Sequence, residues 1–118
     1  MEKQAYLPKV IEWVKRNGFD EIRANMEGFT TPVAYEQQNG QVRLIPDVTA
    51  KSLFEKSYFE IVLKSEDLSK MVIKLHLLSV LAHYKGGRLF LMAPAGHFNF
   101  AKSIAEKYNI YSKIIKIT

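Results

Sequence analysis

Apolar residues recur at helical spacing near the start of the chain. Leu7, Val10, Ile11 and Val14 stand at positions i, i+3, i+4 and i+7, which places their side chains on one face of an α-helix. Asn17-Gly18 then supplies a helix stop signal. We therefore predict a helix from about residue 3 to about residue 17, packed on a core through this face.

Short β-rich runs and turn residues follow this helix. Residues 19–26 resemble an irregular or short strand. Val33–Tyr35 and Val42–Ile45 lie on either side of Asn39-Gly40, a pair typical of tight β-hairpin turns. The pattern predicts two antiparallel strands joined by that turn.

The second half of the chain alternates strands and helices. A loop is predicted over 50–56, before a strand over 57–63. Apolar residues then lie almost all round from Met71 to Ala82, which predicts a helix largely buried against a sheet and ended by Gly86-Gly87. The last predicted elements are a strand over 88–93, a helix over 98–108 and a strand over 113–117.

This element order predicts an α/β fold with a mixed β-sheet flanked by helices. The connection from Leu63 to Arg88 is long enough to join two parallel strands. The chain has 118 residues, of which 47% are hydrophobic, so we expect one domain over 1–118 with a sheet of three or four strands.

Composition removes several functional classes. The chain contains no cysteine, which excludes disulfides, zinc-thiolate sites and thiol nucleophiles. The sequence shows no Gly-x-Ser-x-Gly elbow and no complete glycine pattern for a nucleotide. We expect no membrane association and a cytoplasmic location, because no apolar run reaches about 18 residues and no signal-peptide pattern opens the chain.

Positive charge is concentrated in the second half of the chain. Residues 1–50 hold six Lys/Arg and seven Asp/Glu, a balance of −1, whereas residues 51–118 hold eleven and five, a balance of +6. An anionic partner such as nucleic acid is expected to approach this half, although scattered lysines also serve solubility.

Two acidic residues occur within β-rich runs. Asp47 follows Ile45-Pro46, and Glu60 lies at the centre of the apolar run 58–63. Acids buried in a sheet must find partners, and two close carboxylates either share a proton or bind a divalent cation such as Mg²⁺.

Pro46-Asp47, twelve intervening positions and then Glu60 resemble the signature of the PD-(D/E)XK (restriction endonuclease-like) nuclease superfamily. That signature is a proline-aspartate, a spacer and an acid-x-lysine triplet. The triplet here is Glu60-Ile61-Val62, so valine occupies the usual lysine position. The resemblance implies a small stand-alone member with a restriction endonuclease-like core in the order α-β-β-β-α-β-α-β.

The resemblance also implies a site for Mg²⁺- or Mn²⁺-dependent cleavage of DNA. Asp47, Glu60 and the backbone carbonyl of Ile61 would hold the metal. Two lysines are candidates for the missing catalytic lysine. Lys64 shares the strand face of Glu60, and Lys74 lies on the following helix, where some branches of the superfamily carry a polar residue.

Two functions stay open at this stage. One is an active nuclease, and the other is an inactive nuclease-like module that binds nucleic acid or a protein, as a homodimer or with another partner. His76, Ser79 and His83 form a polar stripe that is interpreted as structural or solvent-facing rather than as a metal site. The turn over 92–97 is a further candidate phosphate contact.

Overall fold

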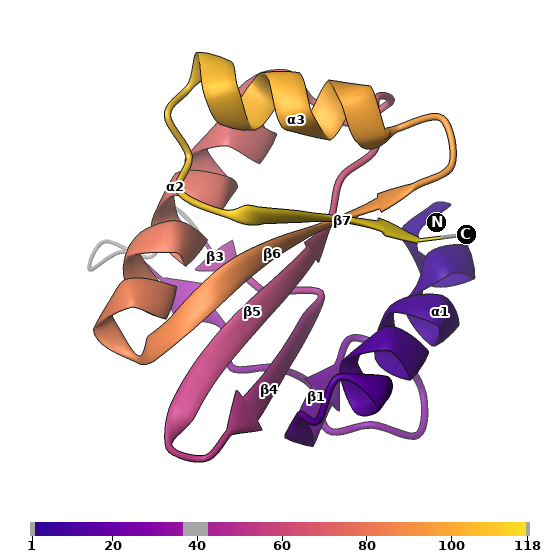
Figure 1. The fold of residues 1–118 in the computed structure, drawn as a ribbon, viewed down its shortest axis with the longest axis vertical. Helices are drawn as coiled ribbons and strands as arrows, with labels where there is room; N and C mark the ends of the chain where they lie inside the picture. The colour runs from indigo at the N-terminus through magenta and orange to yellow at the C-terminus, as the bar shows by residue number, and fades with distance from the viewer. Residues whose placement is uncertain (1, 37–42, 118) are drawn as a thin grey trace.

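A mixed sheet of five strands forms the centre of the molecule (Figure 1). The computed structural model describes residues 2–36 and 43–117. The strand order in the sheet is β1 (Asp20–Ala24), β4 (Val48–Ser52), β5 (Glu55–Ile61), β6 (Gly86–Pro94) and β7 (Lys113–Ile117). β1, β4 and β5 pair antiparallel, whereas β5, β6 and β7 pair parallel. The mixed α/β sheet is confirmed, and it is wider than the three or four strands predicted.

Three helices cover the two faces of this sheet (Figure 1). α1 (Glu2–Arg16) packs on one face, and α2 (Leu68–Tyr84) and α3 (Phe98–Lys107) pack on the other. Side chains alternate between these faces along β5: Phe59 lies in the core under α1, whereas Tyr58 lies in the core under α2 and α3. The layers are therefore helix, sheet and helices, with one hydrophobic core on each side.

The predicted hairpin forms a small second sheet. β2 (Tyr35–Glu36) pairs antiparallel with β3 (Arg43–Leu44), and the predicted Asn39-Gly40 turn lies outside the described residues. The Tyr35 hydroxyl lies 2.7 Å from that of Tyr58 on β5. This hydrogen bond attaches the small sheet to the main one.

The predicted loop over 50–56 is wrong. β4 continues to Ser52 and β5 begins at Glu55, and these two residues face each other across the ladder. The turn consists of Leu53 and Phe54 alone, with Leu53 at φ 58°. Leucine rarely adopts this left-handed conformation, and the turn lacks the Gly, Asn or Pro that normally signals one. Propensity therefore could not locate it.

The sequence suggested that α2 is buried almost all round. In the structure, α2 is buried along one face only. Met71, Leu75 and Leu78 are buried, whereas Ile73 and Val80 are 59% and 54% exposed. Across residues 2–36 and 43–117, no helix combines the length and apolar character needed to span a membrane.

Gly86-Gly87 opens β6 rather than ending α2, which finishes at Tyr84. Gly87 lies against the neighbouring strand so closely that an added Cβ would be 2.0 Å from the Lys56 carbonyl oxygen. The β5–β6 register shifts at this point. Glycine is needed here because two backbones approach each other.

Candidate functional site

The two predicted acids lie next to each other at one end of the β4–β5 pair. Asp47 precedes β4 directly, and Val48 pairs with Phe59, so Asp47 lies beside Glu60. The Asp47 backbone N–H donates to Glu60 Oε1 at 2.9 Å, and the Ile61 N–H donates to Asp47 Oδ2 at 2.9 Å. Both acids are buried. The backbone thus holds both carboxylates in place: Glu60 keeps Oε2 for cations, whereas Asp47 Oδ2 accepts the backbone N–H and also contacts a cation.

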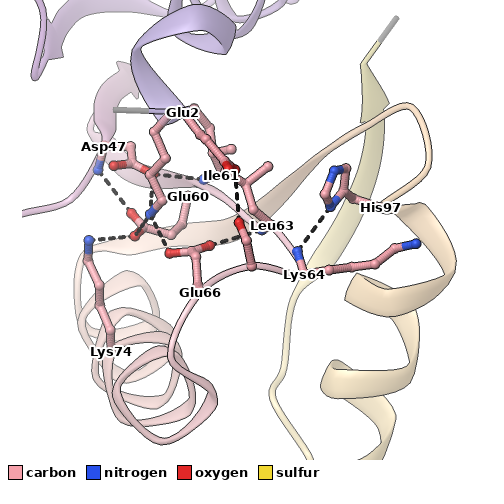
Figure 2. A network of polar contacts seen from close by, with 11 residues as sticks. Glu2, Asp47, Glu60, Ile61, Leu63, Lys64, Glu66, Lys74 and His97 are labelled. Atoms are coloured by element: carbon pink, nitrogen blue, oxygen red, sulfur yellow. Dashed lines mark hydrogen bonds and ion pairs between the residues drawn. The ribbon is translucent and has the colours of Figure 1, made fainter.

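A lysine that the sequence analysis did not select lies between these acids. The Lys3 ammonium, in the first turn of α1, is 3.1 Å from Asp47 Oδ2 and 3.0 Å from Glu60 Oε2. It is also 3.2 Å from Glu66 Oε2, which comes from the loop between β5 and α2. Figure 2 shows the carboxylates of Asp47, Glu60 and Glu66 directed toward one another. The site therefore holds three carboxylates around one ammonium.

Glu66 was also missing from the candidates. Its Oε1 accepts the Leu63 backbone N–H at 2.9 Å, which turns the loop back toward the acids. A sequence signal for Lys3 did exist. Lys3 precedes Leu7 by four residues and Val10 by seven, so it continues the buried stripe of the first helix.

The two candidate lysines have different positions. Lys74 on α2 is mostly buried and its ammonium forms an ion pair with Glu60 Oε2. Lys64 is exposed, and its side chain extends away from the acids (Figure 2). Its backbone N–H donates to His97 Nδ1 at 3.0 Å. Of the two lysines, Lys74 lies at the acids and Lys64 does not.

The two carboxyl groups differ in how strongly they retain a proton. Burial, together with the nearby Glu60 carboxylate, raises the pKa of Asp47 to about 7. Burial would also raise the pKa of Glu60, but the ammonium groups of Lys3 and Lys74 outweigh it and hold this pKa below its usual range. Burial disfavours the Lys3 ammonium, yet the surrounding carboxylates raise its pKa above the ordinary value.

The donor set suits a hard cation. Asp47 and Glu60 supply carboxylate oxygens, which Mg²⁺ and Mn²⁺ prefer, and both carboxylates converge on the Lys3 ammonium; the Ile61 backbone contacts the site through its N–H, which donates to Asp47 Oδ2. Within the described ranges, no group of three or more His, Cys, Asp or Glu side chains is arranged to hold a metal ion. Asp47 and Glu60 are therefore the side chains that a metal ion would use at this site.

A hollow of about 490 Å³ lies beside Lys64 at the carboxyl ends of the parallel strands. Two lysines and two aromatic rings contribute to its wall, together with small and polar residues; the lining consists of Lys64, Gly96, Phe98, Asn99, Phe100, Ser103 and Lys116. No acidic residue of the described chain is among them. The hollow is therefore positively charged and partly aromatic.

The histidines and the serine that were selected from the sequence either make contacts within the fold or lie on its surface. His97, in the predicted phosphate-contact turn, orients the loop through Lys64. His76 and His83 are exposed on α2, as interpreted from the sequence, and Ser79 Oγ donates to the Tyr111 carbonyl at 3.0 Å.

Comparisons with protein-family models, with curated proteins and with solved structures find no match to this chain.

Proposed function

We propose that this chain is a metal-dependent phosphodiesterase that acts on nucleic acid through a restriction endonuclease-like core. The observation that carries the proposal is the convergence of Asp47, Glu60 and the Lys74 ammonium at one end of the β4–β5 pair. Three antiparallel strands of the main sheet precede α2, and two parallel strands follow it. This order supports the proposed core.

Asp47, Glu60 and the Ile61 carbonyl would hold Mg²⁺ or Mn²⁺. When bound, such an ion polarises a phosphoryl oxygen and lowers the pKa of a coordinated water. Glu60 keeps its charge because its pKa lies below the usual range, so an anionic oxygen is available at neutral pH. The backbone N–H of Ile61 orients Asp47 toward the same point.

Lys74 replaces the lysine that is absent from the Glu60-Ile61-Val62 triplet. Val62 and Glu60 lie two residues apart on one face of the strand, and Val62 is fully buried in the core under α2. Lys74 reaches Glu60 from that same α2 side. Its ammonium can orient the attacking water or stabilise the negative charge that develops on the phosphoryl oxygens.

The hollow beside Lys64 supports a nucleic-acid substrate. Lysine side chains attract phosphates, and aromatic rings stack with unpaired bases. Lys64 follows Glu60 by four residues and belongs to both the site's loop and the hollow. A strand that enters the site would therefore continue into the hollow, and Lys64 would bind substrate rather than perform chemistry.

Cleavage assays with matched variants test the function. Wild type should cleave labelled single-stranded, duplex or branched DNA in Mg²⁺ or Mn²⁺ and not in EDTA. Asp47→Asn and Glu60→Gln should each lower cleavage by about 10²-fold or more, because each removes a charged oxygen ligand. Glu12→Gln, at an exposed acid paired with Arg16, should retain the wild-type rate. Equal cleavage by Asp47→Asn and wild type would rule out the proposed site.

A second candidate function is that of a protein-interaction module, as a homodimer or with another partner. The observation in its favour is the β4–β5 turn, where Leu53 and Phe54 are 87% and 99% exposed. Contiguous exposed apolar side chains mark contact surfaces more often than scattered ones do, and Leu53 and Phe54 are adjacent in this turn. Sedimentation should then show a concentration-dependent dimer that Phe54→Ser abolishes. A monomer at every concentration would contradict the homodimer.

A further inference from the structure

We propose that Lys3 is a built-in competitor of the divalent ion, so that metal binds only when the first turn of α1 leaves the site. This inference rests on the proposed function and concerns the regulation of the same site. Its basis is the position of one ammonium within 3.2 Å of oxygens from Asp47, Glu60 and Glu66.

The ammonium and a metal ion would require the same oxygens. Mg²⁺ and Ca²⁺ lie about 2.0–2.6 Å from their oxygen ligands. Asp47 Oδ2 and Glu60 Oε2 are the carboxylate atoms at 3.1 and 3.0 Å from Lys3, and Asp47 Oδ2 and Glu60 Oε1 already accept backbone N–H groups. The Lys74 ammonium also pairs with Glu60 Oε2, so a divalent ion on these atoms beside Lys3 would be a third cation there, against strong repulsion. Binding of a metal ion therefore displaces Lys3.

The acids, and not the helix, favour the position of the Lys3 ammonium. A positive side chain in the first turn of a helix is unfavourable, because the helix N-terminus carries partial positive charge. Lys3 lies in that first turn and its side chain is mostly buried. Its position is thus stabilised by the three carboxylates, and a competing cation removes that stabilisation.

The start of α1 is also weakly attached to the rest of the helix. Pro8 lies inside the helix, where proline lacks the N–H that would bond to the carbonyl of Gln4 and its ring crowds that carbonyl. Two exposed side-chain hydrogen bonds hold the turn: Ser65 Oγ donates to Glu2 Oε2 at 2.8 Å, and Gln4 Nε2 donates to the Asn25 carbonyl at 2.8 Å. Pro8 provides a hinge, and Leu7, which is buried, marks where the fixed part begins.

The site with Lys3 on the acids and the site with Lys3 displaced should differ in metal affinity. While the Lys3 ammonium occupies the acids, the site cannot bind metal. The apparent metal affinity is therefore the intrinsic affinity multiplied by the fraction of molecules whose first turn of α1 has left the site. Free metal concentration would then set how much of the protein has its first turn released. Nuclease activity would be suppressed when divalent metal is scarce.

Calorimetric titration of the full chain with MnCl₂, without nucleic acid, measures this competition. Lys3→Met should bind Mn²⁺ at least tenfold more tightly than wild type, whereas Lys3→Arg, which keeps the charge, should not. Lys9→Met, at an exposed lysine of the same helix, should match wild type. Pro8→Ala should weaken binding, because it restores the helical bond that holds the first turn.

Hydrogen exchange of the wild-type chain provides a measurement that needs no variant. Mg²⁺ should speed exchange of the Tyr6 and Leu7 amides and leave α2 amides unchanged. Slower or equal exchange at these two amides would overturn the proposal, as would equal or weaker Mn²⁺ binding by Lys3→Met.

These results separate the inference from the function. If wild type cleaves DNA but Lys3→Met gains no affinity, the inference alone is wrong. If Lys3→Met binds Mn²⁺ more tightly but neither protein cleaves DNA, the competition stands and the phosphodiesterase proposal is wrong. If neither protein binds Mn²⁺, both are wrong.

Discussion

Asp47 and Glu60 are neighbours that hold their protons with different strength. Burial and the Glu60 charge raise the pKa of Asp47 to about 7, while two lysines keep Glu60 ionised. A buried pair of acids with unequal pKa values is a common feature of catalytic sites. At the residue scale, this difference has a measurable effect on stability.

Asp47→Asn should become stabilising relative to wild type as the pH rises. In the unfolded chain Asp47 ionises near its ordinary value of 3.8, but in the folded chain it retains the proton up to about pH 7. The favourable contribution of Asp47 to the free energy of unfolding is therefore complete below pH 3.8 and is lost as the pH rises through 7. The variant minus wild-type difference in unfolding free energy should grow by up to about 1.4 kcal/mol per pH unit in this window and then level off.

Urea unfolding in EDTA between about pH 5 and 8 measures this difference. Glu60 does not disturb the comparison. Because its pKa in the folded chain is lowered, its contribution to stability is lost only when the pH falls below its ordinary value of 4.5. A difference that is constant across the range would show that Asp47 is ionised in the folded chain at acidic pH.

The sequence selected Asp47, Glu60 and Lys74, which the structure brings together, but not the cation between the two acids. Asp47 and Glu60 stand out because carboxylates are rare in β-rich runs. Lys3 lies 44 residues from Asp47 in a different element, so no local pattern connects the two. Its alignment with the buried stripe of the helix was a usable signal, since a lysine on that face must reach an acid or water.

At the scale of elements, periodicity predicted the helices well and the β4–β5 hairpin poorly. α1, α3 and β7 lie within one or two residues of their predicted bounds, because α1 and α3 have helical apolar spacing and β7 is a short isoleucine-rich run. β4 was missed because its turn, Leu53-Phe54, has no turn-forming residue. Tertiary pairing along both strands overrides the local preference there.

Gly87→Ala should destabilise the fold more than alanine at another glycine. Its Cβ would lie 2.0 Å from the Lys56 carbonyl oxygen, so β5 and β6 would have to separate. We expect a loss of at least about 2 kcal/mol in unfolding free energy. Gly18→Ala is the matched control, because Gly18 has φ 84° but open space around it, and it should cost about 1 kcal/mol. Equal losses in denaturant unfolding would show that the β5–β6 contact is not tight.

At the scale of the whole molecule, the element order indicated a mixed α/β sheet but not its width. The faces were predictable, because side chains alternate along β5. The exposed face of α2 was not, since Ile73 and Val80 are as apolar as the buried residues beside them. Composition alone cannot distinguish a face that packs on the sheet from one that does not.

The hollow beside Lys64 should contribute to nucleic-acid affinity. Lys64→Ala and Lys116→Ala remove the lysines that line it, and each should lower the slope of log affinity against log salt by about 0.7 for single strands. Fluorescence anisotropy with a labelled single-stranded oligonucleotide in EDTA measures both. Lys15→Ala, on an exposed part of α1, is the control. Unchanged slopes in both variants would place the nucleic acid elsewhere on the molecule.

The most direct test of the proposed chemistry is the single-turnover rate of DNA cleavage by Lys74→Ala in saturating Mn²⁺. Lys74 forms an ion pair with Glu60, whereas Lys70, one helical turn earlier on α2, is exposed. We predict that Lys74→Ala cleaves about 10²-fold or more slowly than wild type with little change in oligonucleotide affinity. Lys70→Ala should cleave at the wild-type rate. A Lys74→Ala rate equal to that of wild type would contradict the assignment of Lys74 as the catalytic lysine.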